Sequence, residues 1–290
     1  MKRTFDIITD SGCDMTQAFL KEQGVVCVKL GFTMQNVNYE GENGEKIDEK
    51  QFYQKLRGGA MPTTYQVTGE TAKTYMEKSL KKGRDVLVIA FSSALSGTAS
   101  SFLVAQRELC TKYSKNSVYV VDSLCASMGQ GLLLWYVLQK AETGATVKET
   151  ADFAERIKGE ILHHFTVDNL FHLKRGGRVS SATAFVGSIL KIKPVLHVNE
   201  QGKLVSVGKA MGRKKALHAL VERFFTYRDE AETQVFISHG DCLNDAEYVR
   251  DLLLARAPKL QITIGYIGAV IGSHAGAGTV ALFHKGTKRQ

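Results

Sequence analysis

The segment that most constrains the fold is Asp85–Phe91, which reads DVLVIAF. Almost every position is apolar, so neither face of the strand that it predicts is suited to water. Strands of this kind occur in parallel sheets, where crossover helices cover both faces. We therefore expect an α/β fold built on a parallel sheet.

The residues around this segment alternate between expected strands and expected helices. Further strands are predicted at Phe5–Thr9, Val25–Leu30 and Ser117–Val121. Helices are predicted at Thr16–Gln23, after the capping residue Asp48, at Thr98–Lys112 and from about Ala126. This alternation and spacing are typical of a doubly wound, Rossmann-like parallel sheet.

The pattern changes after the polar, helical stretch Thr146–Lys158. Four strand-like runs follow, at Lys193–Val198, Lys203–Lys209, Gln234–Ser238 and Gln261–Ile267. The first two flank Asn199–Gly202, which is typical of a hairpin turn, so a mixed α/β sheet is expected. Because 290 residues exceed what one hydrophobic core usually supports, we predict two domains, 1–160 and 161–290.

Composition excludes several classes of protein. The net charge of +9 comes without a nucleic-acid motif, and so predicts a solvated basic surface open to an acidic partner or transient contact with anionic lipid. No signal-peptide core follows the N-terminus and no apolar run reaches about 18 residues, so stable membrane insertion is not expected. The five cysteines show no C-x-x-C and no zinc spacing, which predicts a cytoplasmic protein without a metal site.

The loop after the most apolar strand is rich in hydroxyl groups. Ser92, Ser93, Ser96 and Thr98 lie within seven residues that also include Gly97. Ligands of open α/β sheets bind beyond the carboxyl ends of the strands, where helix N-termini attract anions. Capping one helix requires only one of these hydroxyls, so the remainder predict a site for an oxyanion.

Three other loops have less decisive patterns. Ser11 follows the first strand, where a helix cap is the simpler interpretation. Thr63 and Thr64 could direct a hydroxyl into a cleft, or Pro62 and Thr68 could merely start a helix, and the local pattern leaves both open. His274 lies in the expected glycine-rich loop 271–279 with Gly276, where it could donate to a carboxylate or act as a general base.

The segment Lys174–Ser181 reads KRGGRVSS and includes Arg178. It opens an expected helix of small residues, which include Ala182, Ala184, Gly187 and Ser188. Such residues allow either close packing or room for a long apolar ligand, and both remain open. Neither a dinucleotide fingerprint, a phosphate-binding P-loop nor a G-x-S-x-G elbow is present, so no nucleotide cofactor is expected.

Taken together, these motifs resemble the DegV family, whose members include the fatty-acid-binding subunits of bacterial fatty acid kinase. One motif alone would be weak evidence, whereas six in the same order along nearly the whole chain are strong. They are Thr9-Asp10-Ser11, Ser92–Thr98, Asp122-Ser123, Leu173–Ser180, Leu190–Leu196 and Gly272–Gly278.

The resemblance implies a non-catalytic carrier that holds one long-chain fatty acid in a tunnel between two domains. The family's carboxylate contacts carry over to Thr64, Ser93 and His274. Supporting residues are expected among the neighbouring loops, at Ser11, Thr63, Ser92, Ser96, Gly97, Thr98, Arg178 and Gly276. In the kinase system, a partner phosphorylates the bound carboxylate to an acyl phosphate.

The chain departs from the family pattern at Tyr65, Val67 and Met211, and the last of these bears on that partner. The Thr-Ser-Gln-Pro motif continues here as Tyr65-Gln66-Val67, and Met211 replaces an arginine associated with the kinase, for which Arg213 could substitute. Two alternatives follow. One is a hydrolase or transferase that uses Ser93 with His274, and the other is a ligand-sensing regulator without a kinase partner.

Overall fold

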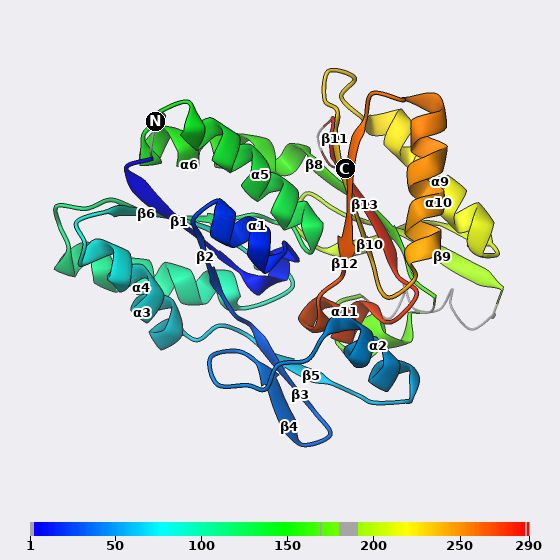
Figure 1. The fold of residues 1–290 in the computed structure, drawn as a ribbon, viewed down its shortest axis with the longest axis horizontal. Coiled ribbons are helices and arrows are strands. Elements are labelled where there is room, and N and C mark those ends of the chain that lie inside the picture. Colours follow the sequence, from blue (N-terminus) through cyan, green and yellow to red (C-terminus); the bar gives the residue numbers. More distant parts are fainter. Residues whose placement is uncertain (1–2, 169, 180–190, 288, 290) are drawn as a thin grey trace.

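The structure is a computed structural model that describes residues 3–168, 170–179, 191–287 and 289. Its first sheet has four parallel strands in the order β2-β1-β6-β7 (Figure 1). The strands are β1 Phe5–Asp10, β2 Val25–Val28, β6 Asp85–Ala90 and β7 Val118–Asp122. The predicted parallel sheet is therefore confirmed.

Helices cover both faces of this sheet, as the apolar pattern of β6 requires. Val86 and Val88 face α3 (Gly69–Leu80) and α4 (Thr98–Lys112), whereas Leu87 and Ile89 face α5 and α6. The last two helices are α5 Met128–Glu142 and α6 Val147–Ile157, and the shorter α1 is Gln17–Glu22. Successive side chains of a strand point to opposite faces, so a continuous apolar run serves two cores.

The second sheet has six strands in the order β10-β9-β8-β13-β11-β12. Only β11 and β12 are parallel, which confirms the predicted mixed sheet and the hairpin of β9 with β10. Helices α9 and α10 pack on one face and α5 on the other. The elements are β8 Ile161–Thr166, β9 Ile192–Val198, β10 Leu204–Met211, α9 Arg213–Tyr227, β11 Gln234–His239, α10 Leu243–Arg256, β12 Gln261–Tyr266 and β13 Val280–Lys285.

Two of these strands, β8 and β13, have no counterpart in the sequence expectations. Both are central and buried, yet His163, His164 and His284 interrupt their apolar pattern. Their polar groups are hydrogen-bonded inside the sheet, which makes burial tolerable.

A small antiparallel sheet, β4-β3-β5, is a further correction. The strand expected at Val25–Leu30 ends at Val28, and the chain continues into β3 Gly31–Met34, β4 Val37–Glu40 and α2 Glu49–Arg57. The segment expected as a loop at Thr63 and Thr64 is β5, Thr63–Tyr65, which pairs with β3. Its residues favour strand geometry, but the segment is short, and the pairing with β3 completes the strand.

The glycine-rich segment 271–279 was expected to be a loop, but it begins inside α11 (Ala269–Ala275). Gly276, at φ +83°, ends that helix, because a left-handed residue cannot continue it. The remaining short elements are α7 Phe171–Arg175 and the 3-10 turns Ser11–Cys13 and Lys158–Glu160. The expected small-residue helix around Ala182 lies outside the described residues.

The two large sheets come from separate stretches of chain, strands 5–122 and 161–285. Buried α5 packs between them, so one apolar cluster contains residues of both sheets. The domain boundary near residue 160 stays a prediction.

Candidate ligand-binding site

A cavity of about 170 Å³ lies between the elements of the two sheets. One buried water needs only about 10–15 Å³ by the same measure, so the space is suited to a larger molecule. Apolar side chains provide most of its wall. They include Leu30, Phe91 and Leu95 from the first half of the chain, and Phe165, Leu173, Val198, Leu204, Ala281 and Phe283 from the second.

Thr64 and His274 form a polar pair in this wall. The Thr64 Oγ1 lies 2.8 Å from His274 Nε2, although the two residues are 210 positions apart in the sequence. Strand β5 supplies the threonine and the last turn of α11 supplies the histidine. His274 Nδ1 is buried without a partner among the described residues. The pair therefore retains hydrogen-bonding capacity for a ligand.

Burial lowers the pKa of His274 to about 4, and the nearby guanidinium groups of Arg178 and Arg175 act in the same direction. The imidazole is consequently neutral near pH 7. A neutral imidazole carries one N–H, so either Thr64 or His274 can donate a hydrogen bond to an incoming anion. Positive charge from the two arginines favours an anion at the same place.

The end of α7 and the residues that follow it keep His274 in position. Arg175 donates to the carbonyl of Pro62 at 2.8 Å and to that of Ser273 at 3.3 Å, which connects the start of β5 with α11. Arg178 Nε donates to Leu95 O at 3.1 Å. A Cβ on Gly176 would come within 2.1 Å of His274 Nδ1, so only glycine leaves space for this imidazole.

The hydroxyl groups of the loop Ser92–Thr98 have different surroundings. Ser92 is fully buried and donates to Gly202 O at 3.1 Å, so it attaches the loop to the β9–β10 hairpin turn. Ser96 lines the cavity and lies 3.0 Å from Thr98 Oγ1. Ser93 is exposed, and its backbone N–H donates to Asp122 at 3.1 Å.

The structure thus brings together five of the predicted site residues as cavity lining, namely Thr64, Ser96, Gly97, Arg178 and His274. The other predicted residues, all described, lie outside that lining. Thr63 and Ser93 are exposed, Ser11 accepts from Leu30 N, Thr98 accepts from Val67 N, Ser92 contacts the hairpin and Gly276 ends α11. Ser93 is therefore not placed with Thr64 and His274, and Ser96 is the loop serine that is.

Sequence reasoning missed several lining residues. His163 closes part of the wall, where its Nε2 accepts from Ala126 N at 3.3 Å and its Nδ1 lies 3.1 Å from Ile161 O. Ser127 also lines the cavity, with a backbone φ of +54°. His163 and Phe165 are two residues apart on β8 and therefore lie on the same face of the sheet, which is the sequence pattern that could have revealed His163 as a lining residue. No local pattern reveals the backbone of Ser127.

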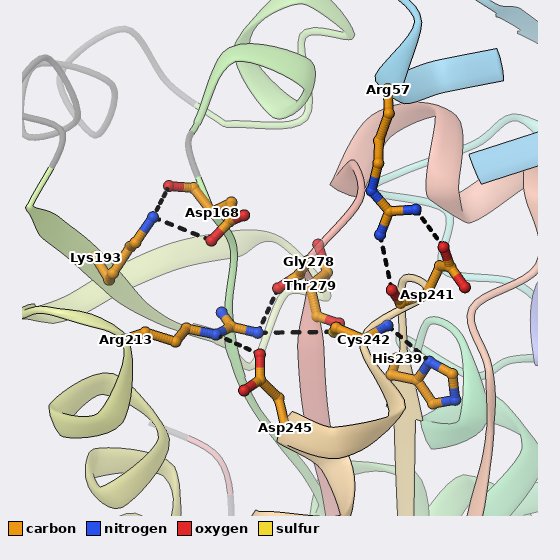
Figure 2. Close-up of polar contacts among 10 residues, drawn as sticks. All are labelled: Arg57, Asp168, Lys193, Arg213, His239, Asp241, Cys242, Asp245, Gly278 and Thr279. Atoms are coloured by element: carbon orange, nitrogen blue, oxygen red, sulfur yellow. Dashed lines mark hydrogen bonds and ion pairs between the residues drawn. The ribbon is translucent and has the colours of Figure 1, made fainter. Parts of the chain in front are cut away.

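Polar contacts outside the cavity support the glycine-rich segment (Figure 2). Arg213 pairs with Asp245 at 2.8 Å and donates to Gly278 O at 2.6 Å. The Cys242 thiol donates to Thr279 O at 3.3 Å. Thr279 lines the cavity, whereas Arg213, Cys242 and Asp245 do not, so these contacts hold one part of the cavity wall from outside the cavity.

Two further features are absent from the described part of the chain. No cluster of three or more His, Cys, Asp or Glu side chains there could hold a metal ion. Over the same residues, no helix combines the length and apolar character needed to span a membrane.

Comparison with known proteins shows the family. The model for uncharacterised proteins of the DegV family matches residues 4–285. The chain belongs to the DegV family. A DegV domain-containing protein of Clostridium perfringens is 40% identical to this DegV chain over 289 residues, which cover 99% of each protein.

Solved DegV structures have the same fold. A structure described as fatty acid binding of a DegV family protein from Thermus thermophilus has a TM-score of 0.87 at 29% identity and covers 98% of this DegV chain and 100% of that one. DegV of Bacillus subtilis, described as a fatty acid binding protein, has a TM-score of 0.84 at 28% identity, with coverage of 99% and 100%. The resemblance inferred from the ordered motifs is confirmed.

Proposed function

We propose that this protein binds one long-chain fatty acid in the cavity, with its carboxylate at the Thr64–His274 pair. The observation that carries the proposal is a hydrogen-bonded polar pair in the wall of an otherwise mostly apolar cavity. The similarity to DegV proteins described as fatty-acid-binding supports the same ligand. Ser96 and Arg178, which also line the cavity, are the proposed supporting contacts.

The energetics of such a ligand require both parts of the site. Burying about sixteen carbons at about 0.8 kcal/mol each contributes about 12 kcal/mol. The loss of freedom on association opposes binding by roughly 4–15 kcal/mol, which can cancel that gain. The carboxylate must therefore recover its lost hydration through charge-assisted hydrogen bonds, each worth about 1.5–3 kcal/mol. Ser96, Arg178 and one member of the Thr64–His274 pair are donors of the required kind.

Native mass spectrometry of gently purified protein tests the binding proposal. We expect one co-purified fatty acid per chain, and uptake of one palmitate by protein from which lipid has been removed. Protein that stays free of ligand when palmitate or oleate is added would refute the proposal.

Presentation of the bound carboxylate to a fatty acid kinase is the downstream step of the proposal. Met211 is 59% exposed where the resemblance expects an arginine. Against substitution by Arg213, its Nε is paired with Asp245 and its Nη2 donates to Gly278 O. Incubation with the organism's own kinase and ATP tests this step. Acyl phosphate formation supports it, whereas bound but unphosphorylated fatty acid supports a ligand-sensing regulator.

The hydrolase or transferase alternative depends on Ser93 and His274. Among the described residues, His274 Nε2 contacts Thr64, and no hydrogen bond joins it to Ser93. No observation therefore favours a serine nucleophile. Ser93-dependent turnover of an acyl ester would support this alternative against the carrier.

A further inference from the structure

Tyr65 lies directly after the proposed carboxylate contact Thr64 and on the opposite side of β5. Its ring extends across its cross-strand partner Gly31. A Cβ on Gly31 would come within 2.2 Å of the ring, and one on Gly41 within 3.0 Å of the hydroxyl. The two glycines thus form a shallow recess that the phenol ring fills.

The position of Tyr65 connects two hollows of the molecule. It lines the cavity together with Thr64, and it also lines a surface groove of about 340 Å³. Its wall includes the polar residues Lys29, Asn38, Asn43, Thr68 and Thr71. Tyr65 therefore stands between the polar part of the cavity and a groove able to accommodate a hydrated head group.

We propose that Tyr65 determines ligand specificity by closing the cavity against acyl ligands whose polar end is larger than a carboxylate. The inference rests on the proposed fatty-acid function. A ligand that ends at Thr64 fits behind the ring, whereas a glycerol ester must extend past Thr64 and would meet the ring. Exclusion by a fixed side chain is an effective source of specificity because it penalises the wrong ligand without weakening the right one.

The chain itself supports a dedicated role for this ring. In the family motif that the chain resembles, the residue at this position is a serine. A serine side chain is too small to fill the recess at Gly31 and Gly41. Tyr65 is 41% exposed, so burial in a hydrophobic core does not account for its size. Its hydroxyl lies 3.4 Å from Tyr39 O, a weak contact, so the ring is the part that occupies the space.

Two variants remove the ring from this position by different means. Tyr65→Ser deletes it, and Gly31→Ala displaces it, because the new Cβ would overlap the ring. Gly31 does not have a left-handed φ, so alanine fits its backbone. Tyr65→Phe keeps the ring. Tyr266→Ser removes a similarly exposed tyrosine, at 36%, that lies on β12 and outside the cavity lining.

Affinities for palmitic acid and for monopalmitoylglycerol are measured by competition with a fluorescent fatty acid. We expect the wild type to prefer palmitic acid, and Tyr65→Ser and Gly31→Ala to reduce that preference by roughly tenfold or more. Tyr65→Phe and Tyr266→Ser should retain it. A preference unchanged in both ring-displacing variants, or absent in the wild type, would overturn the inference. If palmitic acid itself fails to bind the wild type, the proposed function fails instead.

Discussion

Replacement of Thr64 by valine tests the proposed carboxylate site most directly. Valine has nearly the shape of threonine but lacks the hydroxyl that lies 2.8 Å from His274 Nε2. A bound carboxylate would lose one charge-assisted hydrogen bond, about 1.5–3 kcal/mol, so its Kd should rise about 10- to 150-fold. Folding should lose only one neutral hydrogen bond, about 0.5–1.5 kcal/mol.

These two effects can be separated by measuring both on the same samples. Titration with palmitate gives the Kd, and thermal unfolding without ligand gives the Tm, for which a loss of a few degrees is expected. Thr63→Val is the matched control, because Thr63 is the adjacent threonine, is exposed and lies outside the cavity lining. The reasoning is refuted if Thr64→Val binds palmitate within about twofold of the wild type, or if Thr63→Val loses as much affinity.

Three further predictions follow from the same geometry. Ser96→Ala should weaken palmitate binding several-fold and Ser93→Ala should not, because only Ser96 lines the cavity; the reverse order in a palmitate titration would contradict this assignment. Burial and two arginines hold the pKa of ligand-free His274 at about 4, and an adjacent carboxylate would raise it, so affinity should increase as the pH falls from 8 to 6. Calorimetry in buffers of different ionisation enthalpy should show proton uptake that His274→Gln abolishes. Burial lowers the pKa of His164 and His284 in the folded state, that of His284 to about 4, whereas the unfolded chain titrates near 6.5. The unfolded state therefore binds more protons below that pH, and Tm should fall between pH 6.5 and 4; a Tm that is constant over this range would show that these histidines do not control acid stability.

The pattern of the sequence predicted the parts of the molecule that depend on local rules. The apolar run Asp85–Phe91 predicted a strand buried on both faces, and the structure places helices over both. Thr146 with Glu149 forms a capping box at the start of α6, where the sequence predicted a helix. Ordered motifs identified the family. In each case the signal lies within a few consecutive residues, or in their order along the chain.

Tertiary contacts decided the strands that lack such a signal. Strand β5 exists because it pairs with β3, and β8 carries buried histidines whose hydrogen bonds form only inside the assembled sheet. His274 was expected in a loop but lies in α11. The helix continues past Gly272 and ends only at Gly276, so His274 belongs to its last turn.

The resemblance selected Thr64, Ser93 and His274 as one site, and only the folded chain decided which of them meet. Thr64 and His274 are brought together by elements from opposite ends of the sequence. Ser93 and Ser96 have the same chemistry and lie three residues apart, so their composition cannot distinguish them. The path of the loop does so, because Ser92 is held beneath the hairpin turn at Gly202, Ser93 is left in solvent and Ser96 lines the cavity. The sequence by itself therefore determined the fold class and the kinds of group at the site, whereas the direction of each side chain depended on contacts between segments far apart in the chain.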